Sequence, residues 1–108
     1  MQEVEFQDLK ILVNQSKILW TEHVALRLMQ REIKRADVLS CIETGKIIEQ
    51  YPTDKPFPSC LILGKSVSGK DIHVICGLDK GVICYIITAY YPNLEKWESD
   101  LKTRKEGN

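Results

Sequence analysis

The sequence predicts an α+β domain in which N-terminal helices pack on a four-stranded antiparallel β-meander, followed by a short C-terminal helix. Two patterns predict this class. Apolar residues recur at three- and four-residue spacings in the first half, and alternating apolar runs separated by turn residues fill the second. The chain has 108 residues without a linker or repeat, so we expect a single domain over residues 1–108 with its core at about 4–101.

Three helices are expected in the first half. The first should span residues 3–15 and end at a polar Asn-Gln-Ser run. The second should span residues 22–31, because Thr21 is a suitable N-cap. The third fits residues 35–44, and Gly45 stands where a helix C-cap is expected. By their spacing, the buried positions are Phe6, Leu9, Leu12, Val13, Val24, Leu28, Val38, Cys41 and Ile42.

Extended segments dominate the rest of the chain. Strands are expected at residues 46–51, 59–65, 71–77 and 82–91. Joined by short turns, they should pair as an antiparallel meander with the helices on one face and the other face open. A brief apolar run at residues 18–20 is also expected to be extended. The last helix should cover residues 93–101 with Asn93 as its cap, and the polar tail after Leu101 should fray.

The composition is typical of a globular protein, with 44% hydrophobic and 28% charged residues. A formal net charge of zero argues against tight non-specific binding to nucleic acid, but it permits a small local site. No apolar run reaches the roughly 18 residues of a membrane span, and the acidic start does not resemble a signal peptide. We therefore expect a cytoplasmic location and no membrane partner.

No metal and no cofactor are expected. The four cysteines are scattered among apolar residues without a C-x-x-C pair, which predicts buried free thiols rather than a zinc site. A Gly-rich phosphate loop, a G-x-S-x-G motif and an H-E-x-x-H pair are all missing from the sequence. The cysteines are Cys41, Cys60, Cys76 and Cys84.

One stripe of the second expected helix carries His23, Arg27 and Arg31 at four-residue spacings. Such positions lie nearly above one another on a helix. An imidazole can transfer a proton near neutral pH, and planar guanidinium groups suit phosphate oxygens. Lys34 and Arg35 extend the positive patch. The alternatives are a histidine bonded to backbone and a solvated helix face.

Two of the expected strands add candidates. His73 shares a strand face with Asp71 and Ile75, where it can act as a second acid or base or be an ordinary polar residue on the wet face. Thr88 and Tyr90 are two positions apart near the end of the last strand and offer two hydroxyls for a phosphate. The alternative for this pair is that strands favour β-branched and aromatic residues.

An ordered set of motifs, spread over about residues 18–97, resembles a known family. They are H-x-x-x-R-x-x-x-R, G-K-I-I-E-Q-Y, P-x-P-S-C-L-I-L-G, D-I-H-V-I, I-T-A-Y-Y-P and a later Trp97. Together they resemble the small bacterial domain-of-unknown-function 4258 family. Some of its members look like toxins of toxin–antitoxin pairs, grouped with the RelE, barnase and colicin-type nuclease folds. That grouping implies helices followed by a four-stranded antiparallel sheet.

The resemblance implies which positions carry the family pattern, and it also shows one departure. Family members often have a glycine and a Ser/Thr cap before the third helix, where this chain has Glu32, Ile33 and Lys34. A poorly capped helix start and an altered turn are therefore expected. The matching positions are His23, Arg27, Arg31, Gly45, Tyr51, His73, Thr88 and Tyr90.

The leading hypothesis is a metal-independent endoribonuclease, the toxin of a bacterial toxin–antitoxin pair, with RNA as substrate and a cognate antitoxin as partner. His23 would be the base or acid, with His73 as its counterpart. Stabilisation of the phosphate would come from Arg27 and Arg31. Tyr90, the last catalytic candidate, would orient the phosphate together with Thr88 or stack on a base. The remaining substrate contacts would come from Tyr51, Lys34 and Arg35.

Two other functions remain open. The first is a non-catalytic protein-binding module of the same fold, which the zero net charge favours slightly. The second is a small structural protein whose polar stripe is only a solvated face. The nuclease hypothesis requires that the stripe beginning at His23 lies close to the end of the last strand in the folded protein.

Overall fold

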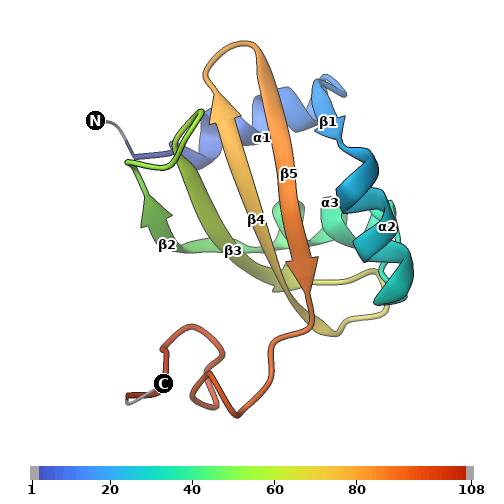
Figure 1. The fold of residues 1–108 in the computed structure, drawn as a ribbon, viewed down its shortest axis with the longest axis vertical. Coiled ribbons are helices and arrows are strands. Elements are labelled where there is room, and N and C mark those ends of the chain that lie inside the picture. The colour runs from blue at the N-terminus through green and yellow to red at the C-terminus, as the bar shows by residue number, and fades with distance from the viewer. Residues whose placement is uncertain (1–2, 107–108) are drawn as a thin grey trace.

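The centre of the molecule is a twisted five-stranded sheet with helices packed against one of its faces (Figure 1). The computed structural model describes residues 3–106. The elements in chain order are α1 (Phe6–Asn14), β1 (Ile18–Trp20), α2 (Glu22–Gln30), α3 (Arg35–Thr44), β2 (Lys46–Tyr51), β3 (Ser59–Lys65), β4 (Asp71–Asp79) and β5 (Ile83–Tyr90). The predicted bounds of α3, β2 and β3 are those of the structure, and most of the other predicted bounds differ by one or two residues.

The α+β class is confirmed, but the prediction of four antiparallel strands is wrong. The strand order is β1-β5-β4-β3-β2, and β1 runs parallel to β5 while the other neighbours are antiparallel, which makes the sheet mixed. The Cys84 amide donates to the Lys17 carbonyl at 2.9 Å just before this pairing. Without β1 the outer edge of β5 would leave its backbone groups unpaired, which explains why so short a segment joins the sheet.

The core fills the space between the sheet and the helices. Its buried residues come from the helix stripes and from alternate positions of β3, β4 and β5. All four cysteines are free and buried here, as the sequence predicted. Burial raises the pKa of the Cys41 and Cys60 thiols to about 12, so both stay protonated at neutral pH.

Helix α3 lies unusually close to β3. A Cβ atom at Gly64 would lie 2.2 Å from the Cys41 carbonyl oxygen, and one at Gly45 would lie 2.5 Å from the same atom. Gly45 does follow the helix as predicted, but its φ of −97° is not left-handed. Glycine is required at both positions because the backbones touch, and not because of an unusual turn.

The turn between α2 and α3 has a left-handed residue at Glu32, whose φ is 57°. The Glu32 amide donates to Met29 and the Ile33 amide donates to Leu28, which is the Schellman pattern of a helix C-terminus. The expected poor cap of α3 is partly relieved, because the Lys34 amide donates to Asp37 at 2.9 Å. The backbone thus keeps a shape that favours glycine although the residue is glutamate.

Replacing Glu32 with glycine is expected to raise the free energy of unfolding by about 1 kcal/mol, because a side chain in the left-handed region costs roughly 1–2 kcal/mol. Urea unfolding followed by circular dichroism measures the change. The control Gln30→Gly, two residues earlier at the last helical position of α2, should lower stability by about 1 kcal/mol. A Glu32→Gly protein no more stable than wild type would contradict the assignment of strain to this turn.

The predicted C-terminal helix over residues 93–101 is wrong. Asn93 does act as a cap, since its side chain accepts from the amides of Glu95 and Lys96, but the helical geometry stops after one turn. The chain then runs back beneath the sheet toward β2 (orange to red in Figure 1). Trp97 explains why the helix ends early. Its buried ring packs against His73 on the sheet, and a helix continued to residue 101 would move that ring away from the sheet.

Candidate functional site

Two groups of polar side chains lie along β5. The first is the α2 ridge, which consists of His23, Arg27 and Arg31. All three side chains are exposed, whereas Val24 and Leu28 on the adjacent side of the helix are buried in the core. The helix can present its polar stripe outward because this apolar stripe anchors it beside β5.

Arg31 connects the α2 ridge to the end of β5. Its guanidinium group donates to the Thr88 hydroxyl at 3.1 Å and to the Ala89 carbonyl at 2.9 Å. His23 lies eight residues earlier, a distance of about 12 Å along the helix axis. The structure therefore brings Arg31 and Thr88 together, while His23 and Thr88 are too far apart to hold one phosphate.

The second group is the His73 cluster, on the sheet face that the helices leave free. Its members are Glu49, Tyr51, His73, Tyr90, Trp97, Leu101 and Arg104. β2, β4 and β5 supply the first four, and the C-terminal segment supplies the rest. The cluster forms because that segment folds back against the end of the sheet where β4 begins and β5 ends.

His73 at the centre of the cluster has no exposed surface. It is therefore not an ordinary polar residue on a solvent-exposed face, which was the alternative for it. Its Nε2 lies 2.7 Å from the Leu101 carbonyl oxygen and its Nδ1 lies 3.2 Å from the Tyr90 hydroxyl. A carbonyl can only accept, so Nε2 carries the proton and Nδ1 accepts from Tyr90. The Trp97 ring packs edge-on against the His73 imidazole, with the two ring centroids 4.6 Å apart.

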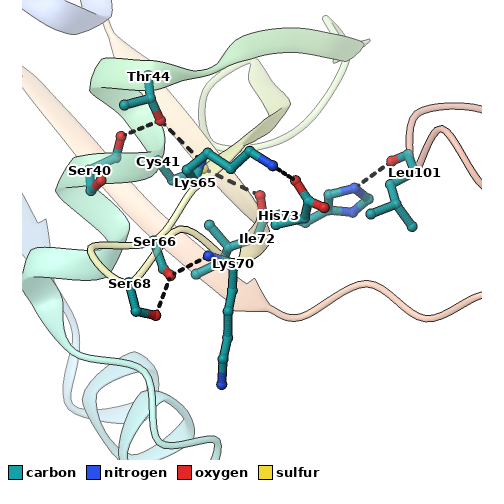
Figure 2. A network of polar contacts seen from close by, with 11 residues as sticks. Ser40, Cys41, Thr44, Lys65, Ser66, Ser68, Lys70, Ile72, His73 and Leu101 are labelled. Atoms are coloured by element: carbon teal, nitrogen blue, oxygen red, sulfur yellow. Dashed lines mark hydrogen bonds and ion pairs between the residues drawn. The ribbon is translucent and has the colours of Figure 1, made fainter.

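Figure 2 shows the polar contacts at the end of β3 and the start of β4, close to His73. Lys65 and Asp71 form an exposed ion pair at 2.6 Å on the neighbouring ends of β3 and β4. The Thr44 hydroxyl accepts from the Lys65 amide, which fastens the end of α3 to the same strand. These contacts join the end of α3 to β3, and β3 to the start of β4, the strand that carries His73.

An ion pair closes the other side of the cluster. Arg104 donates to both carboxylate oxygens of Glu49, at 2.9 and 3.0 Å, and its guanidinium lies 4.6 Å from the centroid of the Trp97 ring. The Tyr51 hydroxyl donates to the same carboxylate at 2.5 Å. The C-terminal segment is therefore held against β2 by a bidentate ion pair. The prediction that the tail after Leu101 frays is wrong for residues 102–105, and residues 107–108 of that tail lie outside the described residues.

Burial and these contacts shift the ionisation of the cluster. Burial lowers the pKa of His73 and raises that of Tyr90. Burial and the Glu49 carboxylate raise the pKa of Tyr51 to about 12. Burial opposes ionisation of Glu49, but the hydrogen bonds from Arg104 and Tyr51 outweigh it and lower its pKa. At neutral pH the histidine is thus neutral, the phenols are protonated and the glutamate is charged.

The predicted site residues fall into separate places. His73, Tyr90 and Tyr51 meet in the covered cluster. Arg31 and Thr88 meet beside it, and Arg27 and His23 continue away along the exposed helix. Lys34 and Arg35 lie past the end of α2, where Lys34 caps α3 and the Arg35 guanidinium lies 5.0 Å from the centroid of the Trp20 ring.

Sequence reasoning missed Glu49, Trp97, Leu101 and Arg104 as site residues. Alternation along β2 places Glu49 and Tyr51 on one face, so Glu49 could have been found from its strand position. Arg104 had no such signal, because a charged residue in a polar C-terminal stretch predicts nothing about its partner.

Two further observations describe the site's surroundings. Within residues 3–106, no group of three or more histidine, cysteine or acidic side chains is arranged to hold a metal ion. Over the same residues, no helix is both long and apolar enough to cross a membrane.

Comparison with known proteins identifies a family. Residues 20–91, more than half of the chain, match the model of a domain of unknown function, DUF4258. Searches of curated proteins and of solved structures returned no match. The matched region includes the α2 ridge, the strands β2 to β5 and most of the His73 cluster, and leaves out the C-terminal segment that covers it. The chain therefore belongs to the DUF4258 family.

Proposed function

We propose that this protein is a metal-independent endoribonuclease and the toxin of a bacterial toxin–antitoxin pair. The observation that supports this is the α2 ridge, in which an imidazole and two guanidinium groups lie exposed in one line beside β5. Successive positions are about 6 Å apart along the helix, so a single RNA strand can place neighbouring phosphates against them. The sequence motifs resemble a family that is grouped with RelE- and barnase-type nucleases, and this resemblance favours the same function.

The ridge contains groups that RNA cleavage requires. The His23 imidazole would take the proton of a ribose 2′-hydroxyl, whose oxygen then attacks the adjacent phosphorus. The bond from phosphorus to the 5′-oxygen breaks, and that oxygen takes a proton from water. Arg27, one turn along the helix, would donate hydrogen bonds to the negatively charged phosphorane oxygens. The products are a 2′,3′-cyclic phosphate and a 5′-hydroxyl.

In this proposal His73 is a positioning residue and not the acid that pairs with His23. Leu101 and Trp97 cover its ring, so it does not reach a substrate. Its Nδ1 instead orients the Tyr90 hydroxyl. Thr88 and Arg31 would then hold the next phosphate of the strand, at the opposite end of the ridge from His23, while the Tyr90 hydroxyl donates its hydrogen bond to His73.

The double substitution His23→Ala, Arg27→Ala is expected to reduce cleavage of single-stranded RNA at least 100-fold, because general base catalysis alone contributes roughly 10²–10⁴-fold. Cleavage of end-labelled RNA is measured in excess chelator, and the product ends are identified by mass. Wild type should yield cyclic phosphate ends under these conditions.

Lys46→Ala is the matched control, since it removes one positive charge from an exposed position on β2, the edge strand on the other side of the sheet from β5, against which α2 packs. Its cleavage rate should equal that of wild type. Intact RNA with the wild-type protein, or equal rates for wild type and the double variant, would overturn the nuclease proposal.

A protein-binding module of the same fold is the alternative. It is favoured by Leu26 and Met29, which leave 52% and 73% of their surfaces exposed on α2. Large apolar side chains on a helix surface suit a protein partner such as an antitoxin. Intact RNA together with tight binding to the product of a neighbouring gene would support this function in place of the first.

A further inference from the structure

A pocket of ≈ 320 Å³ lies between the N-terminal end of α2 and the sheet. His23 lines it from the helix, Tyr85 and Ile87 from β5, and Phe57 from the loop before β3. Small-molecule sites usually measure roughly 300–1,000 Å³. The pocket is therefore large enough for one small ring system and too small for a folded partner.

The walls of the pocket are flat and apolar. The rings of Phe57 and Tyr85 stack with centroids 5.4 Å apart and planes at 19°. Ile87 leaves 42% of its surface exposed beside them. On β4 the lining residue is Gly77, where even a Cβ would reach Ile87 at 3.5 Å. A planar aromatic group can lie against such walls without displacing a side chain.

The rim of the pocket is polar and shares a residue with the α2 ridge. His23 and Lys55 line it, and His23 is also the first residue of the α2 ridge. Asp54 lines it too, and its carboxylate, which accepts from the Ser59 hydroxyl at 2.6 Å, offsets the positive charge of Lys55. The positive charge next to the pocket is therefore that of Arg27 and Arg31 on the α2 ridge. A ligand that fits must join a flat aromatic body to an anionic group, and it must continue along Arg27 and Arg31. A nucleotide within a strand meets both conditions.

We propose that this pocket binds one unpaired nucleobase of the RNA strand whose phosphates lie along the α2 ridge, an inference that rests on the proposed function. The base stacks on the Tyr85 ring, as bases do on aromatic side chains of single-strand binding proteins. Its ribose then lies at His23, where the proton of the 2′-hydroxyl is removed. The pocket thereby selects single-stranded RNA and sets which bond is cut.

The test measures binding separately from cleavage. A short 2′-O-methyl RNA, which cannot be cleaved by this chemistry, is titrated by fluorescence anisotropy against wild type, Tyr85→Ala and the control Tyr91→Ala. Tyr91 is an exposed aromatic residue that does not line the pocket. Tyr85→Ala should weaken binding about tenfold or more, since stacking on one base is worth roughly 1–3 kcal/mol, and Tyr91→Ala should leave it unchanged.

An abasic version of the same strand gives the second measurement. Wild type should bind it about tenfold more weakly than the strand with bases, and Tyr85→Ala should bind both alike. Equal binding of the two strands by wild type, equal affinity of Tyr85→Ala and wild type, or no binding up to about 1 mM would overturn the pocket proposal. If any of these results is found and RNA is still cleaved, the pocket proposal fails and the nuclease proposal is kept. If binding depends on the base but natural RNA stays uncut, the nuclease proposal fails and the pocket proposal is kept.

Discussion

Replacing Gly64 with alanine is expected to lower the free energy of unfolding by about 3 kcal/mol or more. The added Cβ would lie 2.2 Å from the Cys41 carbonyl oxygen and 2.9 Å from its carbonyl carbon and Cα. These are backbone atoms of α3, so no side-chain rotation relieves the clash and the helix must move from the sheet. Domains are stable by only about 5–15 kcal/mol in total, so the loss is a large share. Urea unfolding measures it.

Gly77→Ala is the matched control, because Gly77 is also a buried strand glycine of the same sheet. A Cβ there would meet its nearest atom, Ile87 Cδ1, at 3.5 Å, which is ordinary contact. Its stability should stay within about 1 kcal/mol of wild type. Equal stabilities for the two alanine variants would show that the close approach of α3 to β3 is not what requires Gly64.

Acidification is expected to destabilise the protein through His73. Burial lowers its pKa in the folded state, whereas an unfolded histidine has a pKa of about 6.5. Between these two values the unfolded chain binds more protons, so stability rises with pH across that window. The contribution is complete above about pH 6.5 and is lost progressively as the pH falls toward the folded-state value.

The His73→Gln variant tests this dependence. It keeps a hydrogen-bonding side chain but cannot be protonated, so its stability should fall less than that of wild type between about pH 7 and pH 5. At neutral pH the variant should lose about 1–3 kcal/mol, because one polar contact of the cluster is broken. Urea unfolding at several pH values gives both quantities.

His23→Gln provides the comparison, since His23 is exposed on α2. That variant should keep the wild-type dependence of stability on pH. A His73→Gln protein with the same acid sensitivity as wild type would show that other groups, and not the buried imidazole, cause it.

The fold shows where local patterns suffice. Helices α2 and α3 and the strands β2 and β3 were predicted at nearly their observed bounds, because each has a clear period and ends at a cap or turn residue. The parallel pairing of β1 was not predicted, since three extended residues show no period that names their partner. The C-terminal helix failed for a related reason. Its local signals were correct at Asn93, but the burial of Trp97 against a distant strand outweighed them.

The candidate site also has a part that local sequence predicts and a part that depends on long-range packing. The four-residue spacing of His23, Arg27 and Arg31 places them on one exposed stripe, a consequence of helix geometry alone. The pairing of Arg104 with Glu49, 55 residues apart, depends on how the last segment crosses the sheet. Local sequence does not encode such a partner.

The sequence by itself determined α2, α3, the strands β2 and β3, the buried thiols and the polar stripe of α2, because periodicity and capping act over a few neighbouring residues. Only the tertiary structure decided that His73 is covered, that Arg31 joins Thr88 and that a flat pocket opens beside His23. Those features come from long-range packing, in which apolar burial of Trp97 and α2 sets the positions of polar groups distant in the chain.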